Sequence, residues 1–203
     1  MRTPIFFLGL LLSVCGFAAD GVLAPFVQRE ELAGAVALVA NKDKVLNVTA
    51  VGFADIEAKK PMSADAIFWI ASQSKGITAT AVMMLVDEDK LSLNDPVEKY
   101  LPEFKDQPVA AGKDKTVARA RSITIRDLLS HVSGLPFKSA EEQPTLDGLP
   151  LAAAVKTYAK APLATQPGAH YQYSNAGINT AARVLEVVSG MAYEEFMDKR
   201  LFG

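Results

Sequence analysis

Cysteine and histidine are scarce in this sequence of 203 residues, which contains one of the first and two of the second. The cysteine, Cys15, falls in an N-terminal leader described below, so the remaining chain has no disulfide and no thiol nucleophile. His131 and His170 are too few and too far apart to suggest zinc, and no His-Glu-x-x-His pattern occurs. A glycine-rich phosphate-binding loop is absent as well. The sequence therefore predicts no metal and no cofactor.

An excess of basic residues and a long hydrophobic run are also missing. Lysine and arginine number 21 against 23 aspartates and glutamates, and the formal net charge of -2 argues against a nucleic-acid partner. A local basic run over residues 113–121 is interrupted by Asp114 and contains no aromatic residue, which favours a solvated loop. The apolar run Ile5–Val14 is too short to cross a bilayer, so no membrane span is predicted.

The first 18 residues have the pattern of a secretory signal peptide. Arg2 precedes the apolar run, and the small residues of Gly16-Phe17-Ala18 form a plausible cleavage site. Val14 directly before Cys15 is a poor match to a bacterial lipoprotein signal, so a lipid anchor at Cys15 is not favoured. We expect an exported protein, periplasmic or extracellular, and the sequence gives no indication of its oligomeric state.

Beyond the leader, strand-like patterns give way to helical ones. Gly34–Ala40 and Val45–Phe53 are apolar and rich in β-branched residues, and the turn-like segment 41–44 between them predicts a β-hairpin. Helical spacing dominates after residue 72. The predicted helices, one of which precedes the hairpin, cover residues 22–32, 72–90, 124–130, 151–160, 175–189 and 193–202, and a further short helix is predicted after Pro96 up to Tyr100. A hairpin over 34–53 with a mainly helical part over 72–203 favours an α+β fold class.

Ser72 and Lys75 stand one helical turn apart at the start of the helix predicted for residues 72–90. Serine is a favoured N-cap residue, but a capping box takes Glu or Gln where Lys75 stands, and a cation opposes the helix dipole there. An amine partly buried near a helix N-terminus has its charged form disfavoured, and the neutral amine can accept the proton of a serine hydroxyl. The pair predicts a serine nucleophile with a lysine base. A Ser-x-x-Lys pair by itself is weak, since it is expected roughly once by chance in such a chain.

A second candidate pair, Tyr173 and Asn175, lies where an extended segment enters the helix predicted for residues 175–189. Side chains at such a loop end can meet a substrate held by another element. The ordinary alternative is a half-buried tyrosine and an asparagine N-cap. A different hydrolytic arrangement would use His131 and Asp127 in a Ser-His-Asp triad, but no Gly-x-Ser-x-Gly nucleophile elbow exists, which favours a structural role for His131 in its loop. His170 is interpreted as a packing or loop residue.

With these two pairs in this order, the chain resembles the serine β-lactamase-related superfamily, in its branch of class C β-lactamases, D-alanyl-D-alanine carboxypeptidases and family VIII esterases. The resemblance extends from about residue 30 to the last residue and implies the β-lactamase and penicillin-binding-protein type of α+β fold. The segments that carry it are Phe68–Lys75, Ile77–Ala79, Leu91–Val97, Ile123–Leu135, Pro167-Gly168 and Tyr173–Asn175.

The resemblance also implies a role for each member of the two pairs. Ser72 would be the acylated nucleophile and Lys75 its hydrogen-bonded base. Tyr173 would share proton transfer to and from the serine oxygen and the leaving group, and Asn175 would bind the amide or carbonyl side of the substrate. The backbone N–H of Ser72 would form half of an oxyanion hole, as an N–H at a helix N-terminus can.

One part of the family pattern is not found. A third motif, with Lys or His, a small residue and then Gly, lies on a strand across the cleft in the family, and nothing after Tyr173 fits it. Family members also continue past the segment that corresponds to residues 200–203. We therefore expect residues 19–203 to be an incomplete β-lactamase-related domain, with most of the sheet and the second oxyanion N–H in a missing part.

The resulting hypothesis is an exported serine hydrolase that forms an acyl-enzyme and cleaves an amide, ester or β-lactam bond in a small or peptide-like substrate. The alternative is a non-catalytic or truncated relative that binds peptide or cell-wall fragments without turnover. The sequence does not choose among the possible substrates, because the wall of the cleft that would discriminate between them lies in the missing motif.

Overall fold

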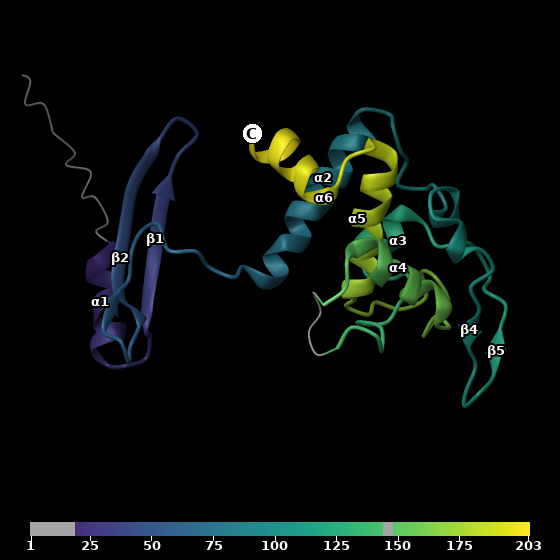
Figure 1. Ribbon diagram of the computed structural model, residues 1–203, viewed down its shortest axis with the longest axis horizontal. Helices are drawn as coiled ribbons and strands as arrows, with labels where there is room; N and C mark the ends of the chain where they lie inside the picture. The colour runs from purple at the N-terminus through teal and green to yellow at the C-terminus, as the bar shows by residue number, and fades with distance from the viewer. Residues whose placement is uncertain (1–18, 144–147) are drawn as a thin grey trace, which may run out of the picture. The chain divides into compact units, whose positions relative to one another are not determined.

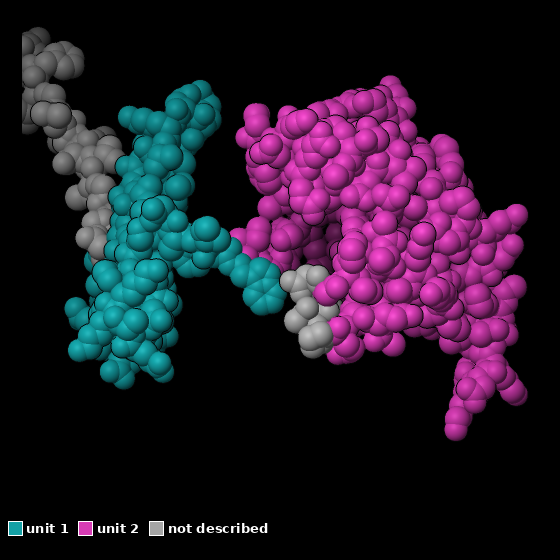
Figure 2. Space-filling model, viewed as in Figure 1, with its two compact units in different colours: residues 1–69 teal, residues 70–203 magenta. Residues whose placement is uncertain are grey.

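The structure, a computed structural model, describes residues 19–143 and 148–203. The predicted signal peptide, with Cys15, lies outside the described residues, as do residues 144–147. The chain divides into two compact units, residues 1–69 and residues 70–203 (Figure 2). None of the helices in the described ranges is long and apolar enough to cross a membrane.

The first unit is a small antiparallel sheet with one helix. Its elements are α1 (Ala19–Gln28), β1 (Gly34–Ala40), β2 (Val45–Asp55) and β3 (Lys60–Pro61), and the strand order is β1-β2-β3. The predicted hairpin is present, with Gly34 opposite Gly52 at its open end. At both glycines a Cβ would overlap the backbone of the other strand or its neighbour, so only glycine lets the chain pass this closely. Helix α1 packs against β2 and β1 (Figure 1).

Helix α1 begins and ends three to four residues earlier than the sequence predicts, over Ala19–Gln28 instead of 22–32. Its end has a local cause, because Glu30 adopts a left-handed backbone with φ of 58°. A residue in this conformation cannot continue a right-handed helix, and it turns the chain towards β1.

The second unit is mainly helical, and α5 (Asn175–Ser189) is its central helix. It contacts α2 (Ser74–Asp87), α3 (Ile125–Leu129), α4 (Leu151–Lys160) and α6 (Tyr193–Phe196) (Figure 1). The large core side chains that are almost wholly buried come from all of these helices and from the segments between them: Leu85, Phe104, Ile123, Ile125, Leu128, Leu135, Tyr158, Leu163, Leu185 and Phe196. The core therefore joins segments more than 100 residues apart.

The helical unit differs from the predictions in three places. Residues 109–117 form a short ribbon, β4 (Val109–Ala110) paired with β5 (Thr116–Val117), where only an irregular connection was expected. Before the ribbon, the short helix predicted after Pro96 is present as the 3₁₀ turn η2 (Val97–Lys99), and a second 3₁₀ turn that was not predicted, η3 (Pro102–Phe104), follows it. The last predicted helix is split, because α6 continues into the π-helical segment η4 (Met197–Phe202). The basic run at residues 113–121 is exposed in the ribbon, but Arg119 forms a half-buried ion pair with Glu98 at 2.6 Å.

Candidate functional site

Ser72 lies in a 3₁₀ turn, η1 (Ala71–Gln73), that leads directly into α2. The turn begins with a left-handed residue, Ala71, with φ of 46°, and regular α-helix begins at Ser74 rather than at Ser72 as predicted. The side chain of Ser72 is exposed and caps neither helix. Its Oγ instead accepts a hydrogen bond from Lys75 Nζ at 3.1 Å. The hydroxyl and the amine are thus paired with each other, in a position open to solvent.

Tyr173 lies two residues before α5 and brings a phenol to the same pair. Lys75 Nζ is 4.8 Å from the centre of the Tyr173 ring. Hydrogen bonding by Lys75, and to a smaller extent by Ser72, holds the pKa of the Tyr173 phenol below its usual value, and the positive charge of Lys75 acts in the same direction. The structure therefore brings Ser72, Lys75 and Tyr173 together from segments about 100 residues apart.

Asn175 is the first residue of α5 and is half-buried. The N-cap of α5 is its neighbour Ser174, whose Oγ accepts a hydrogen bond from Gly177 N at 2.9 Å and donates one to Pro136 O at 2.6 Å. Asn175 is therefore not the cap that the ordinary alternative suggested. Its backbone N–H donates to Phe137 O at 3.1 Å, and its side chain makes no hydrogen bond to the other three residues in the described part of the chain.

His131 lies against Tyr173, which the sequence did not predict. It follows α3 in a left-handed conformation, with φ of 60°. Its ring centre is 4.7 Å from that of Tyr173, and its Nδ1 accepts a hydrogen bond from Ser174 N at 3.2 Å. Burial, and then the charge of Lys75, lowers the pKa of the imidazole. No local sequence signal could have located this contact, because it joins segments about 40 residues apart.

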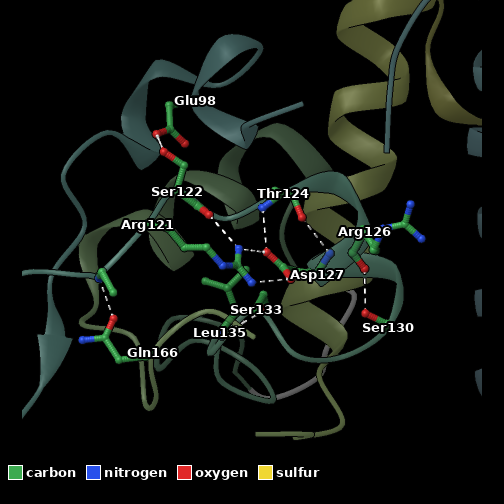
Figure 3. Close-up of polar contacts among 11 residues, drawn as sticks. Glu98, Arg121, Ser122, Thr124, Arg126, Asp127, Ser130, Ser133, Leu135 and Gln166 are labelled. Atoms are coloured by element: carbon green, nitrogen blue, oxygen red, sulfur yellow. Dashed lines mark hydrogen bonds and ion pairs between the residues drawn. The ribbon is translucent and has the colours of Figure 1, made fainter. Parts of the chain in front are cut away.

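Asp127 does not contact His131, so the Ser-His-Asp alternative finds no support. The carboxylate of Asp127 is buried and accepts two hydrogen bonds from Arg121, at 2.5 and 3.0 Å (Figure 3). It also accepts one from Thr124 N, while Thr124 Oγ1 accepts one from Asp127 N, which completes a capping box at the start of α3. Burial would raise the pKa of Asp127, but these bonds outweigh it and lower the pKa.

Arg121 also connects α3 to the segment that leads to Tyr173. The Pro167-Gly168 turn lies so close to this side chain that a Cβ at residue 168 would displace the end of the Arg121 guanidinium, and the backbone conformation of Gly168 is one that favours glycine. Gly168 has a positive φ of 83°, and its N–H donates to Val132 O at 2.7 Å. Gln166, just before this turn, is also bonded to the segment next to Arg121, because its Oε1 accepts a hydrogen bond from Ala120 N at 2.7 Å (Figure 3). These contacts fix one end of the Tyr173 segment.

Two further features of the helical unit concern ligands. In the described residues, no group of three or more His, Cys, Asp or Glu side chains could hold a metal ion. An open groove of about 470 Å³ runs beside the first turns of α2 and the end of η4, lined by Gln73, Gly76, Ile77, Thr80, Leu201 and Phe202. Its residues on α2 are neighbours of Ser72 and Lys75 in sequence, but Ser72, Lys75 and Tyr173 do not line it, so the groove is not the space above the hydroxyl.

The family model described as Beta-lactamase matches residues 19–203. The chain belongs to the beta-lactamase family. The expected α+β fold of the β-lactamase and penicillin-binding-protein type is thereby confirmed, and solved structures with this fold superpose on it, as given next.

The similar proteins include an esterase, a hydrolase with acyltransferase activity and an amidase. The chain is 35% identical over 191 residues to esterase EstB of Burkholderia gladioli, covering 88% of this chain and 47% of that protein. The solved structure of EstCE1, a hydrolase with promiscuous acyltransferase activity, has a TM-score of 0.70 at 32% identity, covering 90% of this chain and 51% of EstCE1. The D-amino acid amidase of Ochrobactrum anthropi SV3 has a TM-score of 0.70 at 26% identity, covering 91% and 48%. The chain spans about half the length of these relatives.

Proposed function

We propose that this protein is a serine hydrolase that cleaves an ester or amide bond through an acyl-enzyme at Ser72. The observation that carries the proposal is the gathering of two proton-bearing side chains, Lys75 and Tyr173, at the exposed hydroxyl of Ser72, with Lys75 Nζ 3.1 Å from Ser72 Oγ and 4.8 Å from the Tyr173 ring centre. Membership of the beta-lactamase family supports it, and so do the esterase and amidase among the similar proteins.

The proposed reaction has two halves. In the first, Ser72 Oγ bonds to the substrate carbonyl carbon, its proton passes to the pair formed by Lys75 and Tyr173, and the C–O or C–N bond breaks as the pair returns the proton to the leaving atom. In the second, water gives up a proton to the same pair and attacks the acyl carbon, which releases the acid and restores the serine hydroxyl. The lowered pKa of Tyr173 brings its phenolate form closer to working pH, which suits a group that both accepts and donates the proton.

The substrate side of the proposal rests on fewer contacts. Asn175, as the first residue of α5, would hold the amide or carbonyl side of the substrate, and the backbone N–H of Ser72 would stabilise the developing oxyanion. We further propose that the substrate is small or peptide-like and that no cofactor takes part. An exported protein fits such a substrate, and the leader at residues 1–18 supports export.

The test is covalent labelling of the protein, as its cell exports it, by a fluorophosphonate probe. The wild type should gain one probe mass on the peptide that contains Ser72, and Ser72→Ala should lose it, because in the described residues Ser72 is the serine whose hydroxyl is hydrogen-bonded to Lys75. Ser74→Ala is the matched control, since Ser74 is also exposed, lies two residues away and has no side-chain bond to Lys75. Unchanged labelling of Ser72→Ala would end the proposal.

Turnover separates the proposal from its rival, a non-catalytic relative that binds peptide or cell-wall fragments. Labelling at Ser72 with hydrolysis of a short-chain nitrophenyl ester supports an esterase, and hydrolysis of nitrocefin in its place supports a β-lactamase. Labelling at Ser72 without hydrolysis of ester, β-lactam or D-amino acid amide favours the non-catalytic relative.

A further inference from the structure

The backbone on both sides of Tyr173 is bonded to a single residue. Gln172 N donates to the carbonyl oxygen of His131 at 2.8 Å, and Ser174 N donates to the His131 imidazole Nδ1 at 3.2 Å. The backbone N–H groups of the two residues on either side of Tyr173 are thus both bonded to His131, one to its carbonyl oxygen and one to its side chain. Because the backbone is fixed on both sides of Tyr173, the direction in which its side chain leaves the backbone is fixed as well.

The imidazole also packs on the Tyr173 ring itself. The ring centres are 4.7 Å apart at an interplanar angle of 34°, while Lys75 Nζ lies 4.8 Å from the same Tyr173 ring. Phe137 stacks on Tyr173 as well, with ring centres 6.3 Å apart. Tyr173 is exposed to solvent at 38% of its surface, so contacts of this kind, rather than a surrounding core, hold its ring in place.

The backbone conformation of His131 suits this double contact. Its φ of 60° lies in the left-handed region, which is uncommon outside glycine but enriched for Asn, Asp and His. In this conformation the carbonyl oxygen and the imidazole of one residue both reach the segment 172–174. A conformation with a steric cost is retained where the surrounding contacts require it.

We propose that His131 is a positioning residue, which holds the Tyr173 phenol against Lys75 and Ser72 through its imidazole, as a neutral acceptor for Ser174 N–H. This inference rests on the catalytic role proposed above for Tyr173. The imidazole does not touch the reacting atoms in this assignment; it acts through the segment that it bonds. Only unprotonated Nδ1 can accept the Ser174 bond, so the hold is made by the neutral imidazole and lost when His131 takes up a proton.

The groups that face the imidazole favour its neutral form. They are Lys75 from α2, whose charge opposes a second cation, and Tyr171 and Tyr173 from the segment before α5. Burial disfavours the charged form first and Lys75 second, and both lower the pKa of His131. At neutral pH the imidazole is therefore an acceptor, and the Ser174 bond fails only as the pH falls through this lowered pKa.

Two substitutions at residue 131 distinguish the hydrogen-bond acceptor of the imidazole from its ability to take up a proton. His131→Asn keeps an acceptor at the place of Nδ1 and tolerates the left-handed backbone, but it cannot titrate. His131→Gly keeps the backbone conformation and removes both acceptor and ring. His170→Asn is the matched control, because His170 is the other histidine of the chain and is exposed in the loop before Tyr173.

The first readout is the rate of fluorophosphonate labelling at Ser72 between about pH 4 and 8. We expect His131→Gly to be slower by about 100-fold at neutral pH, the cost of misplacing a catalytic group by about 1 Å. His131→Asn should remain within about fivefold of the wild type and should lose the part of the acid decline that His131 causes. Wild-type rates in His131→Gly, or an unchanged acid decline in His131→Asn, would overturn the proposal.

The second readout does not depend on activity. The pKa of Tyr173, followed by NMR of tyrosines labelled at the phenol carbon, should move up toward its ordinary value in His131→Gly and stay lowered in His131→Asn and His170→Asn. An unmoved Tyr173 pKa in a folded His131→Gly protein overturns the positioning role. If Ser72 is not labelled in any protein but the Tyr173 pKa moves as expected, the proposed hydrolase fails while the positioning of Tyr173 by His131 stands.

Discussion

The two units of this protein use apolar residues in different ways. In the helical unit, Leu185 and Phe196 are completely buried. In the hairpin unit, no described residue from 21 to 69 is buried, and Leu38 and Val48 expose 60% and 43% of their surface. A hairpin needs only a turn and a cross-strand register, which neighbouring residues supply. A core needs partners that are distant in sequence, and only the helical unit, taken by itself, contains them.

The candidate site lies wholly within the unit that has a core. Ser72 and Lys75 are carried by η1 and α2, and Tyr173 leads into α5, which packs against α2. The distance between Lys75 and Tyr173 therefore depends on the packing of these two helices. Damage to this core should loosen the site, whereas changes to the exposed face of the hairpin should not.

The largest expected effect is that of Leu185→Ala in α5. Leu185 is completely buried, so the cavity and the lost apolar burial should lower the free energy of unfolding by about 2–5 kcal/mol. Val187→Ala, on the same helix but 41% exposed, should change it by less than about 0.5 kcal/mol. Urea denaturation followed by circular dichroism measures both. Equal losses in the two variants would contradict the assignment of α5 as the central core helix.

A smaller effect is expected from Asp127→Asn, which keeps the shape of the side chain and removes its charge. The free energy of unfolding should fall by about 1–2 kcal/mol, because neutral hydrogen bonds replace charge-assisted ones. The loss is limited because solvent around the partly exposed Arg121 screens the ion pair. Asp106→Asn is the control, because Asp106 is exposed and has a left-handed backbone that asparagine tolerates. Thermal unfolding of both variants gives the comparison.

The pH dependence of the same variant tests the cause. The folded state lowers the pKa of Asp127, so the native protein binds fewer protons than the unfolded chain near this pKa. The resulting stability is present above the unfolded pKa of about 4 and is lost as the pH falls through the lowered folded pKa. Asp127→Asn should lack this component of acid destabilisation. An acid profile identical to that of the wild type would assign the stabilisation to groups other than Asp127.

Much of the fold was predictable because its signals are local. The strands at residues 34–53 and the helices α4 and α5 follow from alternation, helical spacing and turn residues, and the capping box of Thr124 and Asp127 fixes the start of α3. The β4–β5 ribbon was not predictable, because strands of two residues are too short to give a pattern. The early end of α1 was not predictable either, because the left-handed residue there is Glu30 and not the glycine that usually marks such a position.

The candidate site was predictable only in part for the same reason. Ser72 and Lys75 are three residues apart, so their proximity follows from helix geometry once a helix is expected there. That Tyr173 meets them was inferred from a family resemblance, because no local rule joins residues 100 positions apart. His131 was assigned to its loop alone, since its contact with Tyr173 arises from a left-handed turn and the packing of α5 on α3.

The smallest effect is expected from Leu38→Ser in β1, which tests the exposed side of the comparison. Leu38 lies opposite Val48 in the hairpin register, and the two residues expose 60% and 43% of their surface to solvent. Replacing an exposed apolar residue should change the free energy of unfolding of the helical unit by less than about 0.5 kcal/mol and leave the labelling of Ser72 unaltered. A loss above about 2 kcal/mol would instead match the removal of a buried leucine, and would mean that this strand face is covered in the folded protein. The two units would then differ in where their apolar side chains find packing partners, inside the helical unit but outside the hairpin unit, and not in how much apolar surface each exposes to water.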